Sequence, residues 1–251
     1  MNSVQKSVLR LLASKVSCAL QGYPGLFRVL KSGFLKLPLA LRGPQMIHDH
    51  LTKLSHEISD PTFCIVGAND GITNDHVYPF ARKGRWRGVA IEPVPGCFGE
   101  LETAYRGLPV KLFNVAIHES DAFATLHFLD PAKASLPPWA KGVGSFDPGR
   151  LGIVEELPGA AGAIAEMRVP CRRLEEVIAE AGYPRIDLLV IDTEGYDAAV
   201  VRQIRFDDWK VRTVIFEHKL LSEQDLDSCL ALLRENGFTL ENDAFDVLAT
   251  R

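Results

Sequence analysis

Short, uninterrupted apolar runs recur along the last three quarters of the chain, and apolar positions at helical spacing fill the intervals between them. The runs are residues 62–66, 88–91, 110–115, 186–191 and 211–216, followed by a closing pair at 238–240 and 247–249. Runs of this length are typical of buried parallel strands. The helical intervals are residues 74–83, 97–105, 172–181, 198–204 and 226–233. Alternating strands and helices predict an α/β fold whose mostly parallel sheet has helices on both faces.

An alternating segment interrupts this order after the third run. Apolar and polar residues alternate over 122–129, which predicts one strand of a hairpin-like insertion, and residues 166–171 predict another short strand. Between them, residues 130–163 are rich in proline, glycine and serine and predict a long loop, a feature that is usually functional or disordered in a compact domain. Within this loop, Trp139 and Phe146 are candidates for an apolar or sugar-stacking wall, or for packing anchors.

The first 48 residues differ from the rest because they contain lysine and arginine but no acid. Apolar positions recur at helical spacing over residues 4–20, and a second apolar, basic piece spans 26–41. Three interpretations stay open: a helical extension packed on the core or on another subunit, an amphipathic segment of residues 1–42 lying on an anionic membrane, and a targeting peptide. A helix is predicted over 48–59, so we divide the chain into a basic helical extension, 1–59, and a folded domain, 60–251.

Composition limits the class of protein and the cellular compartment that we expect. The 251 residues suffice for one α/β domain with an extension. The net charge of -4 excludes a basic nucleic-acid footprint, and no apolar run is long enough to span a membrane. The five cysteines are scattered, as expected for reduced thiols in the cytoplasm. We expect a cytoplasmic protein, with peripheral membrane contact and homo-oligomer formation as alternatives for the extension.

The first apolar run leads into a glycine-bounded turn, Gly67-Ala68-Asn69-Asp70-Gly71. Glycine lets the backbone turn sharply and approach a ligand. The spacing is G-x-x-x-G and differs from the G-x-G-x-x-G of dinucleotide-binding loops. A carboxylate beside a phosphate is unfavourable, so this turn favours a ligand with a cationic or amino-acid-like end, such as S-adenosylmethionine (SAM).

The second run ends in Glu92-Pro93, about twenty residues beyond Gly71. An acid at this point can accept the protons of both ribose hydroxyls. A solvated acid at a strand end is the alternative. The glycine turn upstream favours ribose binding.

Four motifs stand in order along the chain. They are Val66-Gly67-Ala68-Asn69-Asp70-Gly71, Ile91-Glu92-Pro93-Val94-Pro95, Asn114-Val115-Ala116-Ile117 and Ile191-Asp192-Thr193-Glu194-Gly195-Tyr196-Asp197. Over about residues 60–250 they resemble the FkbM family of SAM-dependent methyltransferases. The resemblance implies a Rossmann-like, seven-stranded methyltransferase sheet and SAM as cofactor. The family often has a lysine where Val190 stands here, so any role of that lysine is absent or moved.

The resemblance also implies which residues bind SAM and what the enzyme methylates. The cofactor-binding set comprises Gly67, Ala68, Asn69, Gly71, Glu92, Pro93, Asn114, Val115 and Asp192. Asn114 and Val115 end the third strand, where such a domain meets the adenine edge. The implied reaction is O-methylation of a hydroxyl on a small-molecule or glycan acceptor, either a sugar, a glycan or a polyketide-like compound. N-methylation stays open.

The candidate catalytic residues are Asp192, Glu194 and His218. The two acids follow a central strand, at the edge where ligands bind in open α/β sheets, and we expect them to hold the methionyl end of SAM and to orient the acceptor. His218 is the better base because histidine titrates at about pH 6.5, although a structural histidine is the alternative. A divalent cation bridged by Asp192, Glu194 and Glu217 is compatible with the spacing but not required by it, and we predict no metal.

Two other functions compete with methyl transfer. A nicotinamide-dependent oxidoreductase uses a similar sheet, but the acidic turn and the missing third glycine disfavour it. A non-catalytic module with a SAM-type fold, bound to a membrane or a partner, is the second alternative. Gly67, Glu92 and Asp192 argue for cofactor binding more directly than for turnover.

Overall fold

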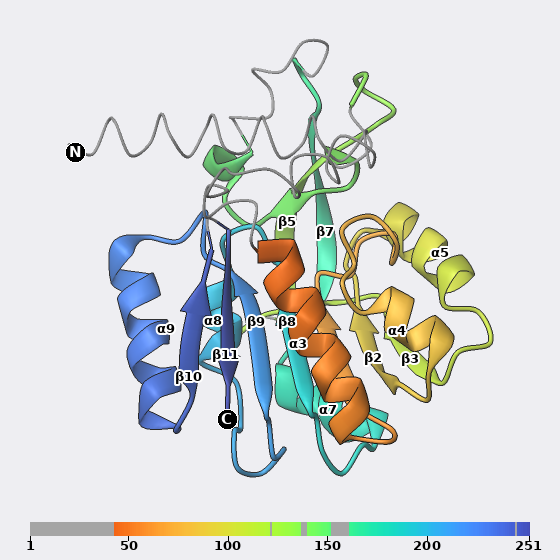
Figure 1. Cartoon of the computed structure of the whole chain (residues 1–251). Helices are drawn as coiled ribbons and strands as arrows, with labels where there is room; N and C mark the ends of the chain where they lie inside the picture. The colour runs from red at the N-terminus through yellow and green to blue at the C-terminus, as the bar shows by residue number, and fades with distance from the viewer. Residues whose placement is uncertain (1–42, 121, 137–139, 152–160, 244) are drawn as a thin grey trace, which may run out of the picture.

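The computed structural model describes residues 43–120, 122–136, 140–151, 161–243 and 245–251 (Figure 1). Its large sheet has the strand order β10-β11-β9-β8-β1-β2-β3. The strands are β1 (Thr62–Val66), β2 (Arg87–Ile91), β3 (Val110–Phe113), β8 (Leu188–Ile191), β9 (Thr213–Glu217), β10 (Thr239–Asn242) and β11 (Asp246–Thr250). β11 runs antiparallel to both of its neighbours, β9 and β10, and the other six strands run parallel to one another. The predicted seven-stranded, mostly parallel sheet with a closing hairpin is therefore confirmed.

Helices cover both faces of the sheet (Figure 1). One layer contains α3 (Gly43–Glu57), α4 (Tyr78–Lys83) and α5 (Pro95–Ala104), and the other contains α7 (Leu174–Ala181), α8 (Asp197–Val201) and α9 (Glu223–Glu235). Alternate side chains of β1 enter the two cores: Phe63 and Ile65 pack in the α3 layer, Cys64 and Val66 in the α7 layer. Within the described residues, none of the helices combines the length and apolar character needed to cross a bilayer.

The helix α3 belongs to the folded body. Ile47, Leu51 and Leu54 are buried in the same apolar cluster as Phe63 of β1 and Ile215 of β9. This helix begins five residues before the predicted segment 48–59 and lies in the part of the chain that the sequence assigns to the extension. The helical pattern predicted within residues 1–42 lies outside the described residues.

A second sheet forms the insertion, in the order β4-β7-β5-β6. Its strands are β4 (Ala116–Ile117), β5 (Phe123–Leu129), β6 (Gly144–Ser145) and β7 (Ile164–Arg172). The long strands β5 and β7 pair antiparallel from Phe123 opposite Pro170 to Leu129 opposite Ile164. The strands predicted over 122–129 and 166–171 therefore form one hairpin, and β7 is longer than expected.

Two element boundaries differ from the sequence prediction. The third strand ends at Phe113 instead of residue 115, because Asn114 turns the chain toward β4 in the second sheet. The first helix begins at Tyr78 instead of residue 74. Asn74 has a left-handed φ of 59°, and Asp75 Oδ1 accepts the amides of Val77 and Tyr78, so these residues form a turn before the helix.

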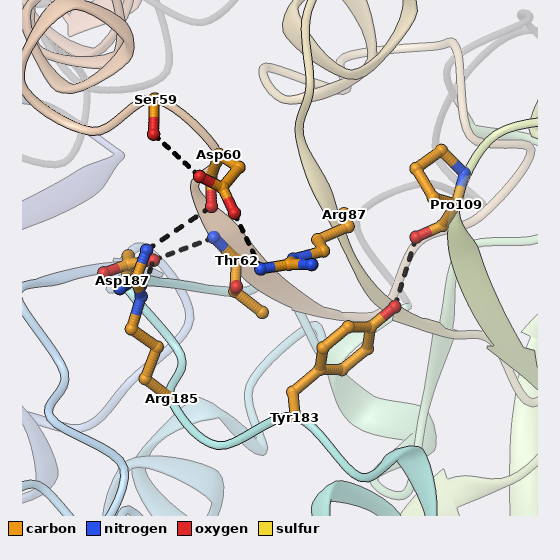
Figure 2. Close-up of polar contacts among 8 residues, drawn as sticks. All are labelled: Ser59, Asp60, Thr62, Arg87, Pro109, Tyr183, Arg185 and Asp187. Atoms are coloured by element: carbon orange, nitrogen blue, oxygen red, sulfur yellow. Dashed lines mark hydrogen bonds and ion pairs between the residues drawn. The ribbon is translucent and has the colours of Figure 1, made fainter.

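The amino-terminal edge of the sheet is closed by polar contacts (Figure 2). Buried Asp187 Oδ2 accepts Thr62 N at 2.8 Å and Arg185 Nε at 3.0 Å. Asp60 pairs with Arg87 at 2.7 Å beside them. These contacts fix the starts of β1, β2 and β8, and ligand chemistry is left to the opposite, carboxyl-terminal edge.

Candidate active site

The glycine turn after β1 adopts the conformation that the sequence predicts. Gly67 and Gly71 have φ values of 86° and 74°, and Asn69 is left-handed at 47°. The amides of Gly67 and Ala68 both donate to Ile91 O at 3.0 Å, so the turn is fastened to the end of β2. Asp70 is engaged by its own turn, because its carboxylate accepts the Ile72 and Thr73 amides and the Thr73 hydroxyl. Its carboxylate therefore has a structural role here.

Glu92 joins the glycine turn to the loop after β2. Glu92 is only 4% exposed. Its two carboxylate oxygens accept hydrogen bonds from Asn69 N at 2.9 Å and from Val94 N at 2.8 Å. Burial raises the pKa of Glu92 to about 7, although the two amide hydrogen bonds oppose that shift. Each carboxylate oxygen has more than one lone pair, so ribose hydroxyls can still donate to it.

The remaining predicted cofactor residues surround Glu92. Asn114 Nδ2 donates to Glu92 O at 2.8 Å and to Pro93 O at 3.1 Å, so the third motif braces the second. Ala68 is buried and Val115 is partly buried against the core, which leaves mainly their backbone atoms for a ligand. The structure thus brings the first three motifs to one edge of the sheet.

The fourth motif lies directly beside the glycine turn. Asp192 N donates to Val66 O at 2.9 Å, and a Cβ on Gly67 would lie 1.7 Å from Asp192 O. Glu194 has a left-handed φ of 50°. Buried Asp197 accepts the amides of Thr193 and Gly195 and holds this strained loop in place.

Three carboxylates gather where β8 and β9 end. One oxygen each from Asp192, Glu194 and Glu217 lies within 4.8 Å of the others. Glu217 enters the site because β9 is the parallel neighbour of β8, with Ile191 opposite Phe216. An ordered turn, a nearby acid and three converging carboxylates fit a ligand that carries a ribose and a cationic end, which are features of SAM.

Enclosure and like-charge repulsion set the acidity of this cluster. Enclosure by the protein and then repulsion from Glu217 and Glu194 raise the pKa of Asp192 well above its usual range, although part of its side chain is open to solvent. Burial and then Glu217 raise the pKa of Glu194 to about 8. A carboxylate with such a pKa can hold or accept a proton near neutral pH.

Lys219 and His218 extend from the end of β9 in different ways. Lys219 Nζ lies 3.1 Å from Glu217 Oε1. Burial acts to lower the pKa of Lys219, but Glu217 and Glu194 outweigh it and raise that pKa. The His218 Nε2 atom lies 3.3 Å from Asp243 O, at the turn between β10 and β11. The imidazole thus contacts this turn rather than the three carboxylates.

The insertion touches both halves of the site. Asn69 Nδ2 donates to Lys141 O at 3.1 Å, and Ser145 Oγ donates to Glu194 O at 2.8 Å. Phe146 packs edge-on against Tyr196 with ring centroids 5.0 Å apart, so it acts as a packing contact of the fourth motif. Trp139 lies outside the described residues. The insertion therefore bridges the glycine turn and the acidic loop.

Sequence reasoning left several of these residues out of the predicted site. The sequence offers Glu217 only as a possible cation ligand. Lys219 could be found from the rule that parallel strands end at the same edge, because it also follows the apolar run before it. Ser145 and Lys141 carry no such signal, since their contacts depend on how the insertion folds back.

Comparisons with known proteins match the motifs to a methyltransferase family. A family model described as the methyltransferase FkbM domain matches residues 66–240. Methyltransferase sdnD of Sordaria araneosa is 26% identical over 221 residues, which cover 79% of this chain and 82% of that protein. The solved N-terminal domain of human METTL16 in complex with SAH is 13% identical, with a TM-score of 0.42 over 87% of this chain and 72% of that chain. Fibrillarin of Aeropyrum pernix with bound S-adenosyl-L-methionine is 14% identical, with a TM-score of 0.38 over 76% of this chain and 66% of that chain.

The family match spans most of the described sheet, from the end of β1 to β10, and includes all four motifs. The resemblance, the α/β methyltransferase fold and the predicted cofactor are thereby confirmed. This chain belongs to the FkbM family of SAM-dependent methyltransferases.

Proposed function

We propose that this methyltransferase acts on a hydroxyl group of a small-molecule or glycan acceptor, with sugars, glycans and polyketide-like compounds as the first candidates. The observation that carries the proposal is the cluster of Asp192, Glu194 and Glu217 beside the glycine turn. An alcohol must lose its proton as it is methylated, and a raised-pKa carboxylate supplies a base for that step.

The proposed division of labour follows the motifs. Gly67, Asn69 and Gly71 present the turn to SAM, Glu92 receives the ribose hydroxyls, and Asn114 with Pro93 and Val115 forms the adenine end. Asp192 binds the cationic methionyl end of the cofactor. When bound, SAM supplies an electrophilic methyl group whose carbon–sulfur electron pair stays on sulfur.

In this proposal Glu194 takes the hydroxyl proton while the acceptor oxygen forms the new bond to the methyl carbon. All atoms and charges are accounted for, because the neutral alcohol becomes an ether and its proton stays on the carboxyl group. Most of the rate then comes from alignment of acceptor and methyl group. His218 is the second candidate base, and its contact with Asp243 O at 3.3 Å favours Glu194 over it in this proposal.

The experiment uses purified full-length protein, SAM with a labelled methyl group, and a panel of hydroxylated sugars, glycans, polyketide-like alcohols and amines. We expect O-methylated product, with turnover lowered at least a hundredfold in Glu194→Gln and much less in His218→Gln. The matched control is Glu102→Gln, an exposed acid on α5. N-methylated product, or equal losses in Glu194→Gln and Glu102→Gln, would contradict the proposal.

A binding measurement separates this proposal from a non-catalytic module. Calorimetry with SAM and S-adenosylhomocysteine, and thermal shift with SAM against NAD, report cofactor binding without turnover. SAM binding without transfer to any panel member would favour the binding module over the enzyme.

A further inference from the structure

Unpartnered oxygens gather at one edge of this protein. Among the residues that the structure describes, the buried side-chain polar atoms without a hydrogen-bond partner are Thr193 Oγ1, Glu217 Oε2 and Asp243 Oδ2. Thr193 follows β8, Glu217 ends β9, and Asp243 precedes the turn into β11, so all three belong to the carboxyl-terminal edge of the sheet. Buried polar atoms are normally satisfied. Of these three atoms, Glu217 Oε2 also belongs to the carboxylate cluster at this edge, where the lack of a donor fits an electropositive ligand.

Asp187, at the amino-terminal edge, is a buried carboxylate with a structural role and serves as a comparison for Glu217. Asp187 is 2% exposed, and its Oδ2 accepts both Thr62 N and Arg185 Nε (Figure 2). The side chain of Glu217 is 11% exposed, and its Oε1 pairs with Lys219 Nζ, but its Oε2 has no donor. The difference points to a ligand-binding role for Glu217.

From these observations we propose that Asp192, Glu194 and Glu217 form a binding site for one divalent cation. The three side chains offer oxygens within 4.8 Å of one another, from the ends of two adjacent strands. Carboxylate oxygens are hard ligands and favour Mg²⁺, Mn²⁺ or Ca²⁺ over softer metals. A cation at this point offsets the repulsion among the three carboxylates, which Lys219 alone does not.

Lys219 is the internal competitor for this position. Its Nζ lies 3.1 Å from Glu217 Oε1, and its side chain is 44% exposed. Because the lysine end of this ion pair is partly open to solvent, the ammonium group can move away when a doubly charged ion arrives. Because the proposed function assigns the cationic end of SAM to Asp192, metal binding is measured without SAM so that the two ligands are distinguished.

The cation site itself is independent of the proposed O-methylation, whereas its role rests on that function. A bound cation would take the acceptor's hydroxyl oxygen as a further ligand and lower the pKa of that hydroxyl. The cation would then orient the acceptor and make its hydroxyl easier for solvent to deprotonate, because Glu194 serves as a cation ligand in this state.

The test is titration of chelator-treated, full-length protein with MnCl₂ and MgCl₂ by calorimetry, with Mn²⁺ electron paramagnetic resonance as the second readout. We expect one ion per chain. Asp192→Asn and Glu217→Gln, which keep side-chain shape, should each weaken binding at least tenfold. Glu102→Gln should bind like the wild type, and circular dichroism verifies that each variant is folded.

The Lys219→Met substitution should change Mn²⁺ affinity in the opposite direction to Asp192→Asn and Glu217→Gln. Removal of the competing ammonium should tighten Mn²⁺ binding at least threefold. Absence of binding in both the wild type and Lys219→Met would overturn the site, as would equal weakening in Glu217→Gln and Glu102→Gln. SAM binding is measured on the same samples: SAM binding without metal binding overturns only the cation site, and metal binding without methyl transfer overturns only the proposed function.

Discussion

At the scale of single residues, position 67 requires glycine for two separate reasons. Its φ of 86° favours glycine, and its missing side chain lets the turn approach Asp192 O. The first requirement can be suspected from the sequence, because glycine is common in such turns. The second cannot, because Asp192 is 125 residues away and only the pairing of β1 with β8 brings it close.

We therefore expect Gly67→Ala to lower the free energy of unfolding by about 3–5 kcal/mol, from backbone strain together with overpacking. Gly107 is the matched control, because its φ is 81° but a Cβ there would meet no atom within 4 Å. Gly107→Ala should cost about 1 kcal/mol, from strain alone. Urea unfolding measures both values, and equal losses would show that crowding against Asp192 is unimportant.

Glu92 carries a pH dependence that can be given a sign. Its pKa is raised by burial from 4.5 to about 7, so the folded state binds more protons than the unfolded state between these values. Stability must then fall as pH rises through this window. Relative to Glu92→Gln, the wild type should lose on the order of 3 kcal/mol of unfolding free energy across it.

Urea unfolding of wild type and Glu92→Gln at a series of pH values from 4.5 to about 7, the ordinary and the raised pKa, tests this expectation. If the unfolding free energies of the two proteins change equally with pH, Glu92 has an ordinary pKa in the folded protein. In the same variant, we expect SAM affinity to fall, because the ribose acceptor loses its charge.

At the scale of elements, the insertion supports the acidic loop. Ser145 on β6 is buried, and its hydroxyl donates to Glu194 O at 2.8 Å. Arg150, which ends the short 3₁₀ turn Pro148–Arg150, packs over Gly195 in the same loop. An unusual backbone persists only where its surroundings determine it. The insertion thus helps to hold Glu194 in its left-handed conformation.

Ser145→Ala should lower stability by about 1 kcal/mol and loosen this loop. Hydrogen exchange should be faster at the amides of Thr193 and Gly195, which donate to Asp197. The control is Ser228→Ala on α9, whose exposed hydroxyl donates to Gln224 O at 2.8 Å and touches no part of the site. Unchanged exchange in Ser145→Ala would mean that the loop is held without the insertion.

At the scale of the whole molecule, the two edges of the sheet have different tasks. The amino-terminal edge is closed by satisfied polar contacts around Asp187 (Figure 2). The carboxyl-terminal edge collects unpartnered oxygens and carboxylates with raised pKa values. Stability and function can therefore be altered separately.

Asp187→Ala should lower the free energy of unfolding by about 2 kcal/mol, because the buried amide of Thr62 loses its acceptor. The affinity for SAM should stay within twofold of the wild type. Asp60→Ala removes an exposed ion pair from the same edge and should cost less than about 1 kcal/mol. A weakened SAM affinity in folded Asp187→Ala would show that the two edges are coupled.

Sequence alone predicts the α/β class, the strands and helices of the large sheet, the insertion hairpin and the family, because each depends on local periodicity or on a short motif. It also located Glu92 and Asp192, since an acid that directly follows a buried strand must lie at the carboxyl-terminal edge. The N-terminal membrane interpretation stays a prediction, because residues 1–42 lie outside the described structure.

The contacts among these groups depend on the tertiary fold. Strand pairing placed Gly67 against Asp192 and brought Glu217 to the acidic loop. The fold of the insertion brings the Ser145 hydroxyl into hydrogen-bond contact with Glu194 O. The turn between β10 and β11 contacts the imidazole of His218. The physical reason is that contacts between distant segments depend on sheet order and register, which no local pattern encodes.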